Sequence, residues 1–243
     1  MDEREINNHI QVNRILNRIK DDAFKLISHN HSITEYEVQR FVIKNYEKYK
    51  LVQSKDRPIV AFNQNSFNPH YCPKRNSKQL KLNTLIMIDI WARLNKKHSP
   101  FGDITWMGYH GKVPKEVQNV FKIVKKSRDD SINFIKNELK KDRIPTGQQV
   151  NEKSKEIIIK SGYEKNIKHG VGHSIGISTS PHGIYSPINR RNKYPLKINM
   201  LYTIEPGIYI KNKFGVRSEI NFYITADRKL IITTKVQKKL IKV

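Results

Sequence analysis

Four carboxylates and one imidazole stand in stretches of this sequence that otherwise have the apolar character of strands. They are Asp89, Asp103, His173, Glu205 and Glu219. Burying a single lone carboxylate is costly, so four carboxylates in apolar strands require compensation. Two divalent cations would supply it, because their positive charges balance the four negative ones while the imidazole binds as a neutral ligand. The residues therefore predict a hydrolytic centre that holds two metal ions.

The mixture of ligand types narrows the choice of metal. Oxygen donors with a single nitrogen favour Mn²⁺, Co²⁺, Fe²⁺ or Zn²⁺ in a catalytic site over calcium or a structural zinc. The lone cysteine, Cys72, excludes both an internal disulfide and a cysteine-rich zinc site. The predicted cofactors are therefore two divalent ions of this group.

Each candidate ligand also has a purely structural interpretation. Asp89 could be a solvated residue of an edge strand, and Asp103 could be a turn residue. A histidine placed like His173 is more often a satisfied core residue, and Glu219 could form a buried ion pair with Arg217. The combination of all these residues favours the metal centre over the separate structural explanations.

Glycines surround the histidine pair His169 and His173. The three at positions 170, 172 and 176 argue against a helix and would let the backbone approach a site closely. A phosphate-binding loop is the weaker alternative, because the spacing fits no phosphate fingerprint and no Lys-Ser or Lys-Thr pair follows.

The elements that must position these residues begin with two helices. Apolar residues at helical spacing predict a helix over 3–28. A second helix is expected to begin at Thr34, because Glu37 stands three positions later in a capping-box arrangement. An Asn- and Pro-rich loop is expected over 63–77, and strands are expected over 58–62, 82–91 and 103–109.

The same order of elements then recurs in the second half of the chain. A long helix is expected from Pro114 to about position 139, and another spans 147–161 and ends at Gly162. Strands are expected near 173–179, 201–210, 215–224 and 229–234. The repeated helix–helix–strand order predicts one internally duplicated α+β domain with no linker inside it.

Composition is that of a soluble globular chain. Its 243 residues are 37% hydrophobic and 28% charged, enough to build a well-buried core. The longest apolar run, around 85–92, contains Asp89 and is too short to span a membrane. The charged N-terminus is unlike a signal peptide. We therefore expect a cytoplasmic protein without a membrane partner.

The formal net charge of +24 is the most unusual feature of the composition. Lysines are scattered over every segment and form no single basic stripe with interleaved aromatic residues. This pattern favours a generally basic surface over a dedicated nucleic-acid face. Nonspecific binding to polyanions at low salt is expected in either case.

The order and neighbours of the candidate ligands resemble the pita-bread metallopeptidases, which include aminopeptidase P, prolidase, methionine aminopeptidase and creatinase. The resemblance covers nearly the whole chain and implies an α+β fold whose two halves surround a curved antiparallel sheet. Asn68-Pro-His70-Tyr-Cys-Pro73 is similar to the prolidase and aminopeptidase P version of a substrate-binding histidine. The motifs around the ligands are His169-Gly-Val-Gly-His173, Thr203-Ile-Glu-Pro206 and Val216-Arg-Ser-Glu219.

The resemblance also implies how the metal ligands divide. Asp89 would chelate one cation, and Asp103 and Glu219 would bridge the pair. His173 and Glu205 would hold the second cation. These assignments come from the family motifs and not from spacing alone.

Catalytic and substrate-binding roles follow from the same resemblance. Glu205 would take the proton from the attacking water and return it to the leaving nitrogen. His70 and His182 would hydrogen-bond the substrate carbonyl and the developing oxyanion. His169 and Arg217 complete the expected substrate-binding set, and Arg217 is also expected to orient an acidic ligand.

Two features depart from the family pattern. Asp89 and Asp103 are fourteen positions apart, farther than in the family, which indicates a longer hairpin loop. The second catalytic histidine of the family falls on Ser180, and His182 follows two positions later. Either a small bulge brings His182 into the role or the role is vacant; we predict that His182 fills it.

The function implied is a two-metal exopeptidase that hydrolyses the N-terminal bond of a peptide, with Xaa-Pro as the expected sequence. One alternative is a non-catalytic module of the same fold that binds peptides, histones or nucleic acid. Another is metal-free hydrolysis of a small amidino compound, as in creatinase. The intact ligand set favours the peptidase.

Residues 1–243 are expected to form the catalytic domain alone. Full-length prolidases and aminopeptidases P usually carry an additional N-terminal domain, which this chain is expected to lack. The chain would then be either a catalytic fragment or a reduced homologue. Formation of a homodimer is left open.

Overall fold

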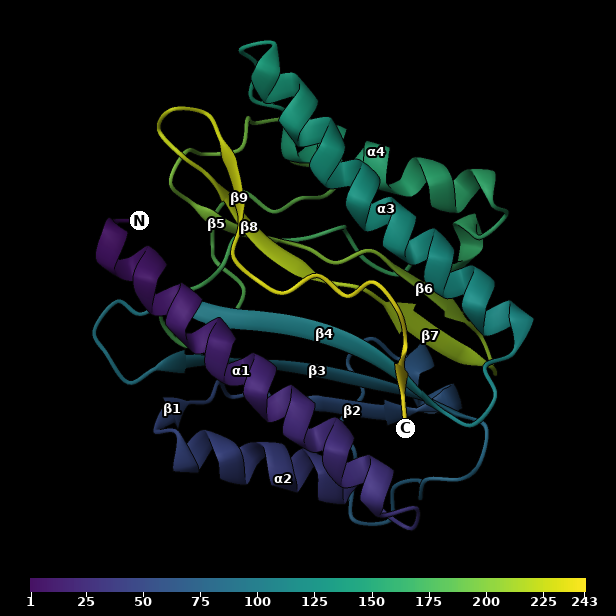
Figure 1. Ribbon diagram of the computed structural model, residues 1–243. Coiled ribbons are helices and arrows are strands. Elements are labelled where there is room, and N and C mark those ends of the chain that lie inside the picture. The colour runs from purple at the N-terminus through teal and green to yellow at the C-terminus, as the bar shows by residue number, and fades with distance from the viewer.

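The chain folds as two successive helix–helix–strand units, described for residues 1–243 in a computed structural model (Figure 1). The first unit contains α1 (Glu3–His29), α2 (Glu35–Lys48), β1 (Leu51–Val52), β2 (Ile59–Phe62), the 3₁₀ turn η1 (Asn63–Phe67), β3 (Thr84–Leu94) and β4 (Phe101–His110). The second contains α3 (Lys115–Lys140), α4 (Gly147–Lys160), η2 (Glu164–Asn166), β5 (Leu201–Ile204), β6 (Gly207–Ile210), β7 (Phe214–Arg217), β8 (Ile220–Ile224), β9 (Leu230–Ile232) and β10 (Ile241–Lys242). The duplicated α+β order predicted from the sequence is confirmed.

Capping residues set where the helices begin. The Thr34 hydroxyl accepts a hydrogen bond from the Glu37 backbone N–H, and the Glu37 side chain accepts one from Thr34 in return, as predicted. Thr146 forms the same kind of box at the start of α4. Pro114 occupies the N-cap of α3, one position before the helix. No helix in the structure combines the length and apolar character needed to cross a bilayer.

The β3–β4 hairpin is the central feature of the first sheet. β1 and β2 both pair antiparallel with β3, and β4 lies on its other side. The C-terminal strand β10 pairs with β4 in parallel, at one edge of this otherwise antiparallel sheet. The chain reaches this edge by crossing from β9 to the C-terminal end of β4 (Figure 1).

The second group of strands is one long hairpin with a break in the middle. β5 pairs with β8 as far as Ile204 and Ile220, and β6 pairs with β7 from Gly207 and Arg217 onward. The strands expected over 201–210 and 215–224 are therefore each divided in two. Pro206 lacks an N–H to donate to the ladder, so regular pairing stops there.

The predicted strand over 173–179 does not form. Gly172 and Ser174 instead make single bridges to Ile188 and Tyr202, which lie in two different segments. A segment that bonds alternately to two neighbours cannot build a continuous ladder with either. These bridges nevertheless fix the backbone of the segment along the edge of β5.

Side chains of β3 are almost all buried, and they pack alternately into two different cores. Ile86, Ile88 and Ile90 pack in the core under α1 and α2, whereas Leu85, Met87 and Trp91 pack in the core shared with α3. Because side chains of a strand alternate between faces, Asp89 shares the second face. Both faces of β3 are therefore covered, and Asp89 points toward the second half of the molecule.

Candidate metal centre

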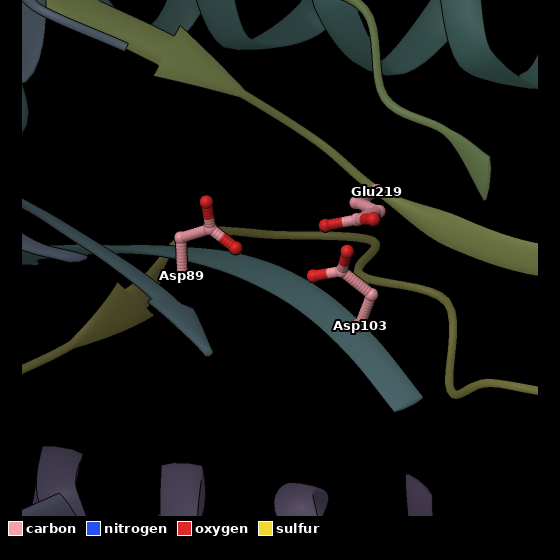
Figure 2. A group of neighbouring side chains, drawn as sticks. All are labelled: Asp89, Asp103 and Glu219. Carbon is pink, nitrogen blue, oxygen red and sulfur yellow. The ribbon is translucent and has the colours of Figure 1, made fainter. Parts of the chain in front are cut away.

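Three carboxylates converge where the two halves of the molecule meet. In the β3–β4 ladder Asp89 lies opposite Thr105, and Trp91 lies opposite Asp103, so the two aspartates are diagonal neighbours on one face. Glu219 comes from the break between β7 and β8. One oxygen from each of the three acidic residues lies within 4.8 Å of the others, and Figure 2 shows the carboxylates turned toward one another.

His173 and Glu205 extend this group. Nε2 of His173 lies 3.3 Å from Oε1 of Glu205 and 3.7 Å from Oδ2 of Asp103. Nδ1 of His173 faces the carbonyl oxygen of Ser174 at 2.9 Å and donates to it, because a carbonyl can only accept. The lone pair of Nε2 is therefore directed at the carboxylates, which is the tautomer that a metal requires.

Close backbone packing places the His173 segment against β5. The His173 backbone N–H donates to the Thr203 hydroxyl at 3.0 Å, and the Thr203 N–H donates to the His173 carbonyl at 2.8 Å. A Cβ at Gly172 would collide with the Thr203 carbonyl oxygen. Glycine at position 172 therefore allows the approach that positions the imidazole.

Burial makes this cluster electrostatically unfavourable by itself. Burial raises the pKa of Asp103 and of Glu219 well above the ordinary carboxyl range, and the neighbouring carboxylates raise both further. The pKa of Asp89 is also raised by burial, although Arg217 opposes the shift. Burial acts in the same direction on Glu205, but the imidazoles of His173 and others together with Arg217 outweigh it and lower its pKa.

Two carboxylate oxygens indicate what is needed to balance the cluster. Oδ1 of Asp89 and Oε1 of Glu219 are buried and have no hydrogen-bond partner in the protein. Buried charged oxygens without partners are strongly destabilising, so native structures satisfy them. Divalent cations would satisfy both oxygens and reduce the repulsion among the carboxylates. The donor set therefore fits the predicted metals.

Arg217 and Thr105 orient the acidic residues. The buried Arg217 guanidinium pairs with Asp89, and its Nε donates to the Thr105 hydroxyl at 3.2 Å. Thr105 in turn donates to Oε2 of Glu219 at 2.9 Å. The direct ion pair between Arg217 and Glu219, considered from the sequence, is not formed. Thr105 was missed, although its position two residues after Asp103 on one strand places both on the same face.

A cavity of about 920 Å³ opens over the acidic cluster. Its lining includes all nine residues predicted from the sequence for the site: His70, Asp89, Asp103, His169, His173, His182, Glu205, Arg217 and Glu219. The His182 ring stacks on His173, with ring centroids 3.7 Å apart and planes inclined by 14°. His182 thus reaches the cluster despite its displacement in sequence, and the exposed His70 lines the same cavity.

His169 is fixed by two partners in the cavity wall. Nδ1 faces the Gly170 carbonyl at 2.7 Å, and Nε2 faces the Tyr209 hydroxyl at 2.7 Å. Since the carbonyl requires a donor, Nδ1 carries the proton and Nε2 accepts from Tyr209. Tyr209 had no assigned role in the sequence interpretation, although it ends the Glu205-Pro-Gly-Ile-Tyr209 motif.

Comparison with known proteins agrees with this geometry. The model of metallopeptidase family M24 matches residues 8–226. An uncharacterized peptidase of Staphylococcus epidermidis is 27% identical over 201 residues, which are 83% of this chain and 53% of the relative. The chain therefore spans about half the length of the curated relatives it matches.

Solved structures share the fold. An X-Pro aminopeptidase from Thermotoga maritima superposes with a TM-score of 0.87 at 26% identity, covering 100% of this chain and 64% of that one. A prolidase from Thermococcus sibiricus gives a TM-score of 0.84 at 26% identity, covering 100% of this chain and 62% of that one. The pita-bread α+β fold that the resemblance implied is confirmed.

Proposed function

The chain belongs to metallopeptidase family M24, and from this premise we propose that it hydrolyses the N-terminal bond of peptides, with Xaa-Pro as the preferred sequence and two divalent cations as cofactors. One observation carries the proposal. Three buried carboxylates, the half-buried Glu205 and the His173 imidazole converge in one cavity, and two of the carboxylate oxygens have no partner in the protein.

The proposed division of the ligands is the one that the family resemblance implies. Asp89 would chelate one cation, Asp103 and Glu219 would bridge, and His173 and Glu205 would hold the other. Cations bound there would polarise the scissile carbonyl and lower the pKa of an attacking water. Arg217 pairs with Asp89 and Thr105 donates to Glu219, and these contacts keep the two carboxylates in position.

Glu205 is the proposed proton carrier. Its pKa is held below the ordinary carboxyl value by His173, His169 and Arg217 against the effect of burial, so the side chain is ionised at neutral pH. An ionised carboxylate beside the bound substrate accepts a proton from water and then delivers it to the leaving nitrogen. His70 and His182, which both line the cavity, would donate hydrogen bonds to the substrate carbonyl and to the developing oxyanion.

Xaa-Pro specificity rests on similarity. The names of the two solved relatives state X-Pro aminopeptidase and prolidase, and the segment Asn68–Pro73 is similar to the version of the substrate-binding loop in those enzymes. Xaa-Pro dipeptides, Xaa-Pro tripeptides and Met-Ala peptides, assayed with Mn²⁺ or Co²⁺, test this directly. Preferential cleavage of Met-Ala peptides would contradict the specificity.

Glu205→Gln tests the mechanism. The substitution keeps the shape and removes the proton acceptor, so we expect kcat to fall by about 100-fold or more. Elemental analysis of the variant must show the same metal content as that of the wild type. A variant that keeps its metals and its full rate would refute the role of Glu205.

A non-catalytic binding module is the second candidate, and the net charge of +24 is the observation that favours it. Elemental analysis separates the peptidase from the binding module. A non-catalytic module would contain no metal after purification and would still contain none after incubation with Mn²⁺. A cytoplasmic location, a peptide partner and pairing with a second copy are proposals that rest on the sequence alone.

A further inference from the structure

A buried carboxylate lies outside the metal centre, at the first residue of α2. Glu35 is 0% exposed. It accepts hydrogen bonds from the backbone N–H of Phe62 at 2.5 Å and of Lys78 at 3.1 Å. The Asn65 amide donates to both of its oxygens at 2.9 Å, and the Tyr71 hydroxyl donates at 2.7 Å. No basic side chain pairs with it, so neutral donors alone satisfy this carboxylate.

All four donors come from one stretch of the chain, residues 62–78. After η1 this stretch contains no helix or strand. The start of α2 holds its far end as well, since the Glu35 backbone N–H donates to the Lys78 carbonyl at 3.0 Å. Glu35 therefore gathers the beginning, the middle and the end of a segment that has no regular secondary structure to fix it.

The same segment forms one wall of the cavity over the metal centre. Pro69, His70, Tyr71 and Cys72 line it. Tyr71 is the residue after His70, and its hydroxyl is held by Glu35 and by Asn65, which donates to it at 2.9 Å. The His70 side chain itself makes no hydrogen bond with the protein; only its backbone N–H is bonded, to Asn68. The place of the His70 ring is thus set by the path of its neighbours.

Glu35 does not take part in the chemistry directly. It is absent from the cavity lining, and both of its oxygens already accept hydrogen bonds. Replacing a buried carboxylate on which several donors converge is costly, because each donor would lose its hydrogen-bond acceptor. Such an arrangement fixes a geometry that an apolar contact would leave adjustable.

We propose that Glu35 is a positioning residue for the cavity: by gathering Phe62, Tyr71 and Lys78 it sets where His70 stands in the cavity wall. The inference rests on the proposed function, in which His70 hydrogen-bonds the substrate. It adds a residue of α2, a helix that contributes no metal ligand, to those on which the reaction depends.

Glu35→Gln is the test variant, and Glu37→Gln is its matched control. The two positions are on the same helix turn, but Glu37 is exposed and bonds only to Thr34. The substituted amide at position 35 would present its N–H₂ to groups that are themselves donors. We expect kcat/KM on an Xaa-Pro tripeptide to fall about 10- to 100-fold in Glu35→Gln with unchanged metal content, as for a displaced catalytic group. Glu37→Gln should retain wild-type activity.

A double-mutant cycle separates positioning from general damage. In a His70→Ala background, Glu35→Gln should cause little further loss, because the group that it positions is already absent. A merely structural defect would reduce kcat/KM by the same factor in both backgrounds, and that result would overturn the inference. If Glu35→Gln fails to fold, Tyr71→Phe removes one of the same hydrogen bonds and is expected to show a smaller loss with the same dependence on His70.

Hydrogen–deuterium exchange gives a readout independent of activity. Amides of residues 62–78 should exchange faster in Glu35→Gln than in the wild type and in Glu37→Gln, while those of β4 remain unchanged. Faster exchange in a chain that hydrolyses no peptide would support the positioning and refute the proposed function. Unchanged exchange together with unchanged kcat/KM would overturn the inference and leave the function intact.

Discussion

At the residue scale, the metal centre combines groups that repel one another. Asp103 and Glu219 are buried, and nearby carboxylates raise the pKa of both beyond the effect of burial. Only one cationic side chain, Arg217, enters the cluster, and it pairs with Asp89. The free protein therefore holds more acidic groups than its own cations can balance, and metals would remove this imbalance.

Neutralising one carboxylate should stabilise the metal-free protein. We expect Glu219→Gln to raise the thermal unfolding midpoint in excess EDTA at neutral pH, because it removes like-charge repulsion and can still accept from Thr105. The same variant should lose the stabilisation that Mn²⁺ gives the wild type, about 2.7 kcal/mol at a metal concentration 100 times Kd. A lower midpoint for Glu219→Gln in EDTA would contradict the argument.

The pH dependence of the metal-free wild type follows from the same shifts. The folded-state pKa of Glu219 lies above its unfolded value, so between the two values the folded state binds more protons. Stability should therefore decline as the pH rises from the ordinary carboxyl range through the raised pKa. Thermal melts in EDTA should show a smaller decline for Glu219→Gln than for the wild type.

His182 is the residue whose role most needs a direct test. Its ring stacks on His173 within the cavity, although it stands two positions beyond the expected place. His182→Ala should reduce kcat by roughly 100-fold, as the loss of an oxyanion donor does, with both metals retained. His98→Ala, an exposed histidine on the β3–β4 loop, is the control. Equal rates for both variants would show that the second histidine role is vacant.

At the element scale, helix α1 supports the strand that carries Asp103. His9 on α1 faces the Phe101 carbonyl through Nδ1 at 2.7 Å and the Asn13 amide through Nε2 at 2.9 Å. Asn13 donates to Oδ1 of Asn221 at 3.3 Å, and the Asp103 backbone N–H donates to the same oxygen at 3.3 Å. A chain of polar groups thus joins α1, β4 and β8 behind the metal ligands. It requires His9 to be neutral, with the proton on Nδ1.

This requirement predicts a loss of stability in mild acid. Burial lowers the pKa of His9 from 6.5 to about 4, against a smaller opposing effect of the Phe101 carbonyl. The unfolded chain therefore binds a proton that the folded chain rejects as the pH falls from 6.5 toward 4, which costs roughly 3 kcal/mol across that window. Urea titrations measure the free energy of unfolding at each pH, and between pH 6.5 and 4 this free energy should fall more steeply for the wild type than for His9→Asn. Equal pH dependence in the two proteins would exclude His9 as the cause.

At the scale of the whole molecule, the cavity exists only because the two units meet. The first unit contributes Asp89, Asp103 and His70, and the second contributes His173 and the hairpin break that carries both glutamates (Figure 1). Neither unit alone holds enough ligands for two cations. The excess of 46 basic over 22 acidic residues belongs to the whole surface, since it is spread over both units.

The net charge predicts weak binding to any polyanion. We expect the protein to bind a random-sequence DNA duplex at about 20 mM salt. The logarithm of the binding constant should fall linearly with the logarithm of the salt concentration, as counterion release requires, and binding should be absent near roughly 300 mM salt. Fluorescence anisotropy with DNA and with labelled heparin measures it, and Glu205→Gln should bind like the wild type. Sequence-dependent binding that survives high salt would indicate a dedicated nucleic-acid face.

Local patterns in the sequence determined much of this protein. The Thr34–Glu37 capping box, the order of helices and strands, and carboxylates within apolar strands are legible from neighbouring residues, because caps and burial leave short-range signatures. All nine residues that the sequence analysis assigned to the site are among those that line the cavity. Only the fold decided what they contact. Arg217 meets Asp89 across 128 positions, and Glu35 meets Tyr71 across 36, because strand register and loop path, which no local pattern encodes, bring them together.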